Sequence, residues 1–121
     1  MHTVIETAQF LRQAAEAGMT DLDRFHLVTM LGEQPDAGDL IVGTGGARKV
    51  RFGGKGKGKS GGFRAITLYT STSIPVFLLT VFAKGVKVNL TQAERNKLDK
   101  LSATLVRSYA NKVVTLPARA G

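Results

Sequence analysis

The longest apolar run of the chain is "IPVFLLTVFA", from Ile74 to Ala83. In an extended strand, successive side chains point to opposite faces of a sheet, and here both sets of side chains are apolar. We therefore expect a strand that is covered on both faces. The run has about half the length that a helix needs to cross a bilayer, so it does not predict a membrane span.

The segments before this strand predict an α+β domain. A strand candidate at residues 3–6 precedes two helical patterns, which Thr7 and Thr20 are placed to cap. The expected apolar stripes of these helices are Phe10, Leu11, Ala14 and Ala15 in the first, and Leu22, Phe25, Val28 and Leu31 in the second. A glycine-rich kink at residues 43–46 leads into a strand at 47–52. A strand at 63–70 then joins the apolar run as an antiparallel hairpin.

The clearest helix lies in "NLTQAERNKLDKLSATLVRSYA". Thr91 and Glu94 fit a capping box at its start. Its expected packing stripe consists of Leu98, Leu101, Leu105 and Tyr109. A chain of 121 residues has room for one hydrophobic core. We predict a single domain over residues 1–110 and a C-terminal tail over residues 111–121.

The net charge of +8 is unevenly distributed along the chain. Residues 1–47 carry seven acidic and two basic residues, a net charge of −5. From Arg48 onward there are fifteen basic and two acidic residues, a net charge of +13. Clustered Lys and Arg gain from phosphate contacts and counterion release, so this polarity predicts a face that binds a polyanion. The alternative is a generally basic, solvated surface.

The stretch "GGKGKGKSGGFR", residues 53–64, matches the phosphate-binding pattern G-x-x-x-x-G-K-S of nucleotide hydrolases. A genuine loop of that class opens directly into a helix, because the helix N-terminus and the loop amides bind the phosphates together. Here strand-type residues follow, and no Asp or Glu lies between Leu40 and Ala93 to hold magnesium. The sequence therefore argues against nucleotide hydrolysis.

The same loop fits a different ligand. In an extended conformation Lys55, Lys57 and Lys59 point the same way and form a row suited to a phosphodiester backbone. Further bases flank the loop without an intervening carboxylate. The expected RNA-binding residues are Arg48, Lys49, Arg51 and Lys59. A flexible connection kept soluble by its lysines is the alternative interpretation.

Other chemistries have little support in the composition. The chain has no cysteine, and two histidines, His2 and His26, do not build a zinc site by themselves. We expect a structural role for His26, no metal and no cofactor. The N-terminus shows no basic segment followed by an apolar run, so we expect no signal peptide and a protein of the cytoplasm.

Four segments together carry a resemblance to a known family. They are "GTGGARKVRF", "GKGKSGGFR", "FLLTVFAKG" and "NLTQAERNKL", which lie between Gly43 and Leu101. In this combination the chain resembles the RelE/HigB-like toxins of bacterial type II toxin-antitoxin systems, especially the HigB-like branch. The resemblance implies a RelE-like α+β fold: a strand, two helices, then a three-stranded antiparallel sheet segment and a C-terminal helix.

The resemblance also implies an activity. It is that of a metal-independent, ribosome-dependent mRNA endonuclease that inhibits translation. In such toxins the 2′-hydroxyl attacks the adjacent phosphate while basic side chains stabilise the extra negative charge. Matched by position, the catalytic residues are Lys55, Lys57, Arg64 and Lys84. The implied partners are mRNA, the ribosome and a cognate antitoxin, a helix-turn-helix protein of the HigA-like kind, with no membrane.

The sequence departs from this family after Lys84, where it reads "GVKVNLT" in place of Asn-Glu and further acids. An arginine and a tyrosine that relatives often use near here are missing. Tyr69 is a candidate substitute if its strand faces the site, and a packing role is the alternative. Two other functions stay open: a ParE-like gyrase inhibitor on the same scaffold, and a nucleic-acid-binding module without catalysis. The row of lysines with Arg64 favours the nuclease over the gyrase inhibitor.

Overall fold

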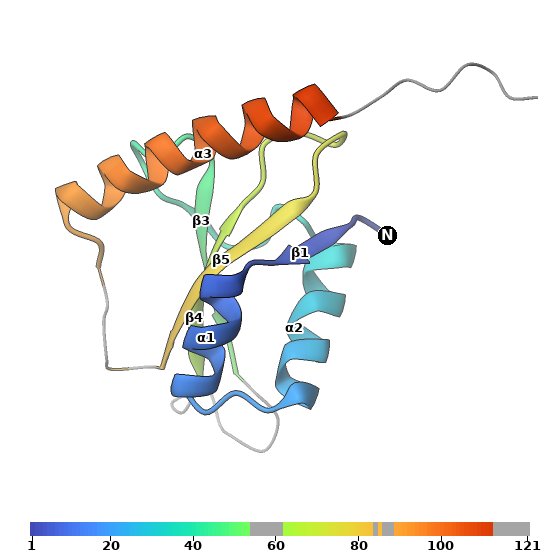
Figure 1. Ribbon diagram of the computed structural model, residues 1–121. Coiled ribbons are helices and arrows are strands. Elements are labelled where there is room, and N and C mark those ends of the chain that lie inside the picture. Colours follow the sequence, from blue (N-terminus) through green and yellow to red (C-terminus); the bar gives the residue numbers. More distant parts are fainter. Residues whose placement is uncertain (54–61, 84, 86–88, 113–121) are drawn as a thin grey trace, which may run out of the picture.

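The computed structural model describes residues 1–53, 62–83, 85 and 89–112, with side chains as far as Tyr109 (Figure 1). None of the helices described there is long and apolar enough to cross a bilayer. The elements in chain order are β1 (Val4–Glu6), α1 (Ala8–Glu16), α2 (Asp21–Glu33), β2 (Asp39–Leu40), β3 (Ala47–Phe52), β4 (Phe63–Leu68), β5 (Val76–Ala83) and α3 (Gln92–Lys112).

The strands form one mixed five-stranded sheet in the order β1-β5-β4-β3-β2. β3 pairs with β4 and β4 pairs with β5, both antiparallel, the second pair as the hairpin pattern predicts, and β2 is a short antiparallel edge. β1 pairs with β5 in parallel, with Val4 opposite Val76. The predicted α+β class is confirmed. The parallel pairing of β1 with β5 was not predicted from the sequence.

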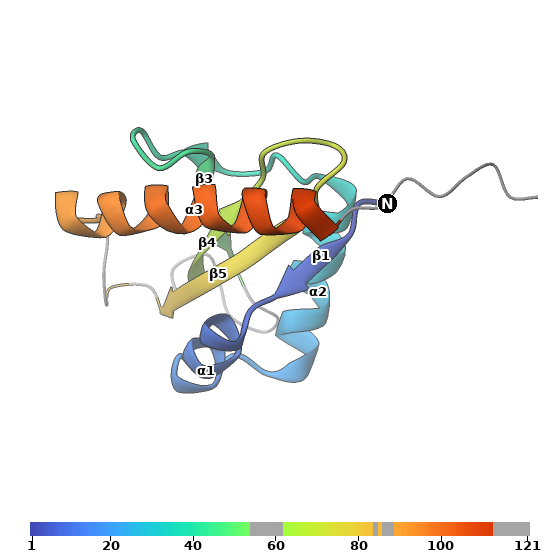
Figure 2. The same ribbon diagram turned by 45° about the horizontal axis from the view of Figure 1, so that its top comes forward.

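Helices cover the two faces of the sheet in different ways (Figures 1 and 2). α1 and α2 lie on one face, where Phe10 and Leu27 pack against Phe63 and Val81. α3 crosses the other face near one end of the strands, where Leu105 packs against a cluster that includes Leu68 and Phe77. β5 is consequently buried from Val76 to Val81, which confirms the expectation that both its faces are covered.

The predicted helix starts are confirmed. The Thr7 hydroxyl accepts a hydrogen bond from the backbone N–H of Phe10 at 3.2 Å. Thr20 and Asp23 form a reciprocal capping box, with both distances at 3.0 Å. The box at the start of α3 joins Thr91 and Glu94 in the same way, at 2.8 and 3.2 Å. Each cap satisfies backbone donors that have no partner within the helix.

The predicted apolar stripe of α2 is partly wrong. Leu22 and Phe25 are 47% and 62% exposed, whereas Leu27 and Leu31 are fully buried. The reason lies in the capping box, because Asp23 turns inward to cap the helix and is itself buried. Positions four residues apart share a helix face, so Leu27 and Leu31 follow Asp23 into the core.

The stripe of α1 shows a similar difference. Phe10 and Ala14 are buried in the core, while Leu11 and Ala15 are exposed. The two buried residues lie four positions apart, so α1 presents a narrow apolar line to the sheet. The residues of α1 on either side of this line remain available for other contacts.

The glycine-rich kink predicted at residues 43–46 attaches α3 to the sheet. Ser102 of α3 is buried and donates a hydrogen bond from Oγ to the carbonyl of Thr44 at 2.9 Å. Gly45 has φ of +73°, and a Cβ there would lie 3.1 Å from Asp99 Oδ1. Only glycine combines this backbone conformation with so close a helix. Leu101, predicted in the packing stripe, is 40% exposed because Ser102 takes the inward position.

Candidate functional site

Two arginines lie opposite each other on the face of the sheet that α3 partly covers. In the β3–β4 register Arg51 is the partner of Arg64, and Lys49 is the partner of Ile66. Directly opposed residues of antiparallel strands point to the same face, with Cβ atoms about 4.5–5.5 Å apart. The structure therefore brings together three of the predicted bases, Lys49, Arg51 and Arg64, on one face. Like charges placed in this way destabilise a sheet, so the arrangement needs a compensating reason.

Arg64 is half-buried, and one nitrogen of its guanidinium has no partner in the described part of the chain. Its Nη1 atom is shielded from solvent and has no acceptor among the described residues. β3, β4 and β5 contain no Asp or Glu. A guanidinium forms two parallel hydrogen bonds to a phosphate group. The site is thus suited to an anion that comes from outside the chain.

β3 ends and β4 begins beside this arginine pair. Phe52 and Phe63, the next pair in the register, close the β3–β4 ladder at its base. A Cβ on Gly62 would lie 2.5 Å from the carbonyl oxygen of Phe52, so the two backbones approach closely there. The predicted residues Lys55, Lys57, Lys59 and Lys84 lie outside the described residues.

Arg48 is separated from the other bases. It pairs with Thr67 on the side of the sheet that carries α1 and α2, as the alternation of β3 requires. Its Nη1 atom donates to the carbonyl of Gly38 at 3.3 Å, and its Nε has no acceptor among the described residues. This predicted RNA-binding residue therefore does not lie with Arg51 and Arg64.

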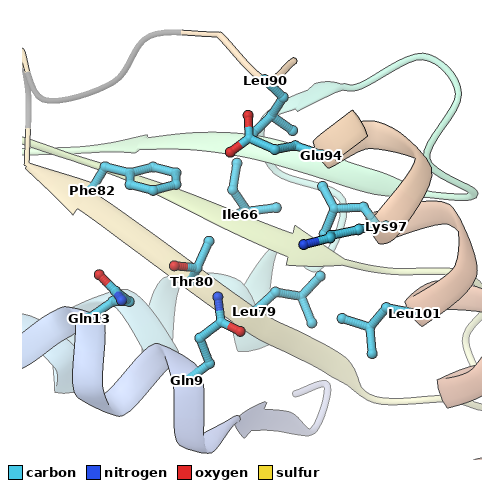
Figure 3. A pocket seen from close by; sticks show the side chains of 11 residues that line it. Gln9, Gln13, Ile66, Leu79, Thr80, Phe82, Leu90, Glu94, Lys97 and Leu101 are labelled. Carbon is cyan, nitrogen blue, oxygen red and sulfur yellow. The ribbon is translucent and has the colours of Figure 1, made fainter. Parts of the chain in front are cut away.

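A cavity of about 490 Å³ adjoins Arg64 between α1, α3 and the floor made by β4 and β5 (Figure 3). Phe82 in its wall is the cross-strand partner of Arg64, and Ile66 is two residues along the same strand. The β4–β5 register shifts at Leu79, and such a bulge re-aims side chains, so both Leu79 and Thr80 line the cavity. Its polar lining consists of Gln9, Gln13, Thr80, Glu94 and Lys97.

Sequence reasoning missed this cavity and the bases of α3 beside it. Lys97 lines the cavity, and Arg95 and Lys49 line a neighbouring hollow of about 290 Å³. The available signal was the concentration of bases in the first turns of α3. Gln9 and Gln13 lie at i and i+4, which puts them on one side of α1, but nothing in the sequence places that side next to β5.

Both tyrosines make edge-on contacts with other rings. Tyr69 follows β4 at the end far from Arg64, and its ring meets His2 edge-on with centroids 5.3 Å apart. Tyr109 meets Phe77 in the same manner at 6.2 Å. These contacts support the packing alternative for Tyr69 and agree with the predicted packing position of Tyr109. His26 is exposed on α2, with its ring 5.8 Å from that of Phe25.

This small α+β domain has a mixed sheet that places Arg51 and Arg64 opposite each other near a cavity, an arrangement suited to an anionic ligand. One comparison with known families makes this more specific. The family model described as "RelE toxin of RelE / RelB toxin-antitoxin system" matches residues 2–119. The chain therefore belongs to the RelE family, as the resemblance implies, and is a toxin of a toxin-antitoxin system. Membership implies an antitoxin protein as its partner.

Proposed function

We propose that this toxin is a ribosome-dependent mRNA endonuclease that inhibits translation in the cytoplasm. The observation that carries the proposal is the pair Arg51 and Arg64, with an Nη1 atom of Arg64 buried without an acceptor in the described part of the chain. Burying an unpaired donor costs about 1–3 kcal/mol, which a bound phosphate would offset. Arg64 is the proposed ligand of the scissile phosphate.

The proposed chemistry needs no cofactor. The 2′-hydroxyl oxygen of one nucleotide attacks the adjacent phosphorus, and its proton passes to a base. The bond from phosphorus to the 5′-oxygen of the next nucleotide breaks, and that oxygen takes up a proton. The products are a 2′,3′-cyclic phosphate and a free 5′-hydroxyl. The phosphorane between these steps carries an extra negative charge, which fixed cations stabilise more strongly than they stabilise the substrate.

The remaining roles are assigned by position in the sequence. Lys55, Lys57 and Lys84 are proposed to surround the same phosphate as Arg64. Crowding of like charges favours the neutral form of a lysine, and a neutral lysine is the proposed acceptor of the 2′-hydroxyl proton. Lys49, Arg51 and Lys59 are proposed to hold neighbouring phosphates. The proposed antitoxin is a helix-turn-helix protein of the HigA-like kind.

The test is induced expression of the wild type, Arg64→Ala and Arg64→Lys, with growth, protein synthesis and mRNA 5′ ends measured in the same cells. Arg107→Ala is the matched control, because Arg107 is an exposed arginine of α3. We expect wild type and control to produce new in-frame ends that carry a 5′-hydroxyl and need phosphorylation before adapter ligation. Arg64→Ala should reduce their yield about 10²- to 10³-fold, and Arg64→Lys should restore little because it lacks the planar fork.

The other functions predict different results. Arrest of DNA replication before translation, without new ends, would support a gyrase inhibitor. Arrest of translation without new ends would support RNA binding without catalysis. New ends that persist undiminished in Arg64→Ala would remove Arg64 from the site. Purified toxin added to mRNA with and without ribosomes then separates ribosome-dependent cleavage from cleavage of free RNA.

A further inference from the structure

The cavity beside Arg64 is lined by polar side chains that have no hydrogen-bond partner among the described residues. Gln9, Gln13, Thr80 and Lys97 all line it, and their side chains make no hydrogen bond or ion pair within the part of the chain that the structure describes. Figure 3 shows the amide of Gln9, the hydroxyl of Thr80 and the amine of Lys97 directed into the space between α1 and α3. These groups are free to bind a ligand.

Glu94 differs from the other polar residues of the cavity. Its carboxylate oxygen Oε1 accepts the backbone N–H of Thr91 at 2.8 Å, which fixes the side chain at the start of α3. The polar groups that remain available are therefore two amides, one hydroxyl and one ammonium. This set can both donate and accept hydrogen bonds, and Lys97 gives it a positive charge.

The rest of the cavity suits a flat apolar surface. Ile66 and Leu79 form part of the floor, Leu98 and Leu101 lie on the α3 side, and the half-buried ring of Phe82 forms a wall (Figure 3). The volume of about 490 Å³ lies within the ordinary range of small-ligand sites, about 300–1,000 Å³. A nucleobase has this character, because its faces are apolar and its edge carries donors and acceptors.

The position of the cavity links such a base to the phosphate site. Phe82 is the cross-strand partner of Arg64, and opposed side chains of neighbouring strands lie within contact distance of each other. A phosphate on the Arg64 guanidinium therefore places the base of an adjoining nucleotide at the mouth of the cavity. Single-stranded RNA is recognised in this way elsewhere, with an unstacked base on an aromatic ring and its edge hydrogen-bonded to polar side chains.

We propose that the cavity receives an unstacked nucleobase of the bound RNA, and that Gln9 and Gln13 determine which base is accepted. The proposal rests on the proposed function, since the phosphate at Arg64 is what brings the base to the cavity. A carboxamide presents a donor and an acceptor side by side, the arrangement that reads a base edge. Phe82 stacks on the base, and Thr80 and Lys97 bind the remaining edge atoms.

An apolar side chain from a protein partner fits the cavity less well. It would cover the apolar wall but leave the amides of Gln9 and Gln13 and the Thr80 hydroxyl without water and without partners. Burying such groups unpaired opposes binding. The positive charge of Lys97 in the cavity lining also favours a ligand that carries phosphate.

The first experiment compares the sequences at mRNA 5′ ends for the wild type, the double variant Gln9→Ala/Gln13→Ala, and Thr80→Val. Glu16→Ala is the matched control, because Glu16 is exposed at the end of α1 and does not line the cavity. We expect the wild type and control to share one base preference beside the cut. In the double variant that preference should weaken by about 5- to 100-fold, the range for loss of a two-point amide contact. An unchanged base preference at unchanged yield would overturn the proposal.

The second experiment does not depend on cleavage. The four ribonucleoside 3′-monophosphates are added to nitrogen-15-labelled Arg64→Lys protein, which keeps a cation at the phosphate site, and the side-chain amide signals of Gln9 and Gln13 are followed. Shifts of these signals that differ among the bases support the cavity, even if the wild type makes no new mRNA ends and the nuclease proposal fails. No shift with any of the four would overturn the base site, and loss of antitoxin binding alone in the double variant would assign the cavity to the protein partner.

Discussion

The two faces of the sheet are built for different purposes. On the face under α1 and α2, Phe10, Leu27 and Phe63 are almost completely buried and fill the space with apolar side chains. On the opposite face α3 covers only one end, and the remainder carries Arg51 and Arg64 beside a cavity. One face of the sheet is thus filled by apolar side chains. The other face combines an apolar cluster under α3 with the opposed cations Arg51 and Arg64, whose repulsion opposes folding. The cationic part of this second face is the one proposed to bind RNA.

The largest expected effect comes from replacing a phenylalanine by alanine on each face of the sheet, which tests how differently the two faces are packed. Phe63→Ala removes a ring that is 1% exposed from the α1/α2 face and should lower the free energy of unfolding by about 3–5 kcal/mol. Phe82→Ala, on the neighbouring strand but beside the cavity, should lower it by about 1–2 kcal/mol because that ring is half-buried. Urea unfolding measures both values.

The contrast between the two phenylalanines should extend to function. Phe82→Ala should reduce mRNA cleavage at normal protein levels, whereas Phe63→Ala should reduce it only as far as it reduces the folded population. Equal losses of stability in the two variants would show that the cationic face is packed as firmly as the other, and the comparison would fail.

The sequence predicted the elements of this fold more reliably than their orientation. Local signals were sufficient for the three helix caps and for the β4–β5 hairpin, because each depends on residues close together in the chain. The predicted stripe of α2 was partly wrong: Leu31 is buried as predicted, but Leu22 and Phe25 are exposed and Leu27, which was not predicted, is buried. The side of α2 that faces the core is set by the inward position of Asp23, which depends on tertiary packing and not on a local sequence pattern.

The candidate site likewise shows that local sequence patterns do not determine how distant segments come together. Successive side chains of a strand point to opposite faces, so the position of Arg48 on the face away from Lys49 and Arg51 follows from β3 being a strand. The opposition of Arg51 and Arg64 depends on the register of two strands joined by a loop of about ten residues, which no local pattern fixes. The cavity is even harder to predict from the sequence, because it forms only where Gln13 of α1, Phe82 of β5 and Lys97 of α3 come together.

A smaller effect concerns the attachment of α3 to its face. Ser102→Ala leaves the carbonyl of Thr44 without the hydrogen bond from Oγ, so the free energy of unfolding should fall by about 1–2 kcal/mol. Ser108→Ala, at an exposed position of the same helix, is the control and should change it by less than about 0.5 kcal/mol. Amide hydrogen exchange should be faster in α3 of Ser102→Ala and unchanged in α1. Uniformly faster exchange in all the helices would instead mean that α3 unfolds together with the rest of the domain.

The smallest expected effect is a gain in stability, whereas the substitutions above all reduce stability. Arg64→Met keeps an unbranched side chain but removes both the unpaired Nη1 donor and the repulsion with Arg51. The free energy of unfolding should therefore rise, by up to about 1 kcal/mol, while cleavage activity is lost. Arg51→Met relieves the same repulsion without removing a buried unpaired donor, so its gain should be smaller. The repulsive part is screened by salt, and the difference between each variant and the wild type should narrow as salt is added. A clear loss of stability in Arg64→Met would mean that Arg64 supports the fold, and the division of the sheet into a stabilising and a binding face would have to be abandoned at its central residue.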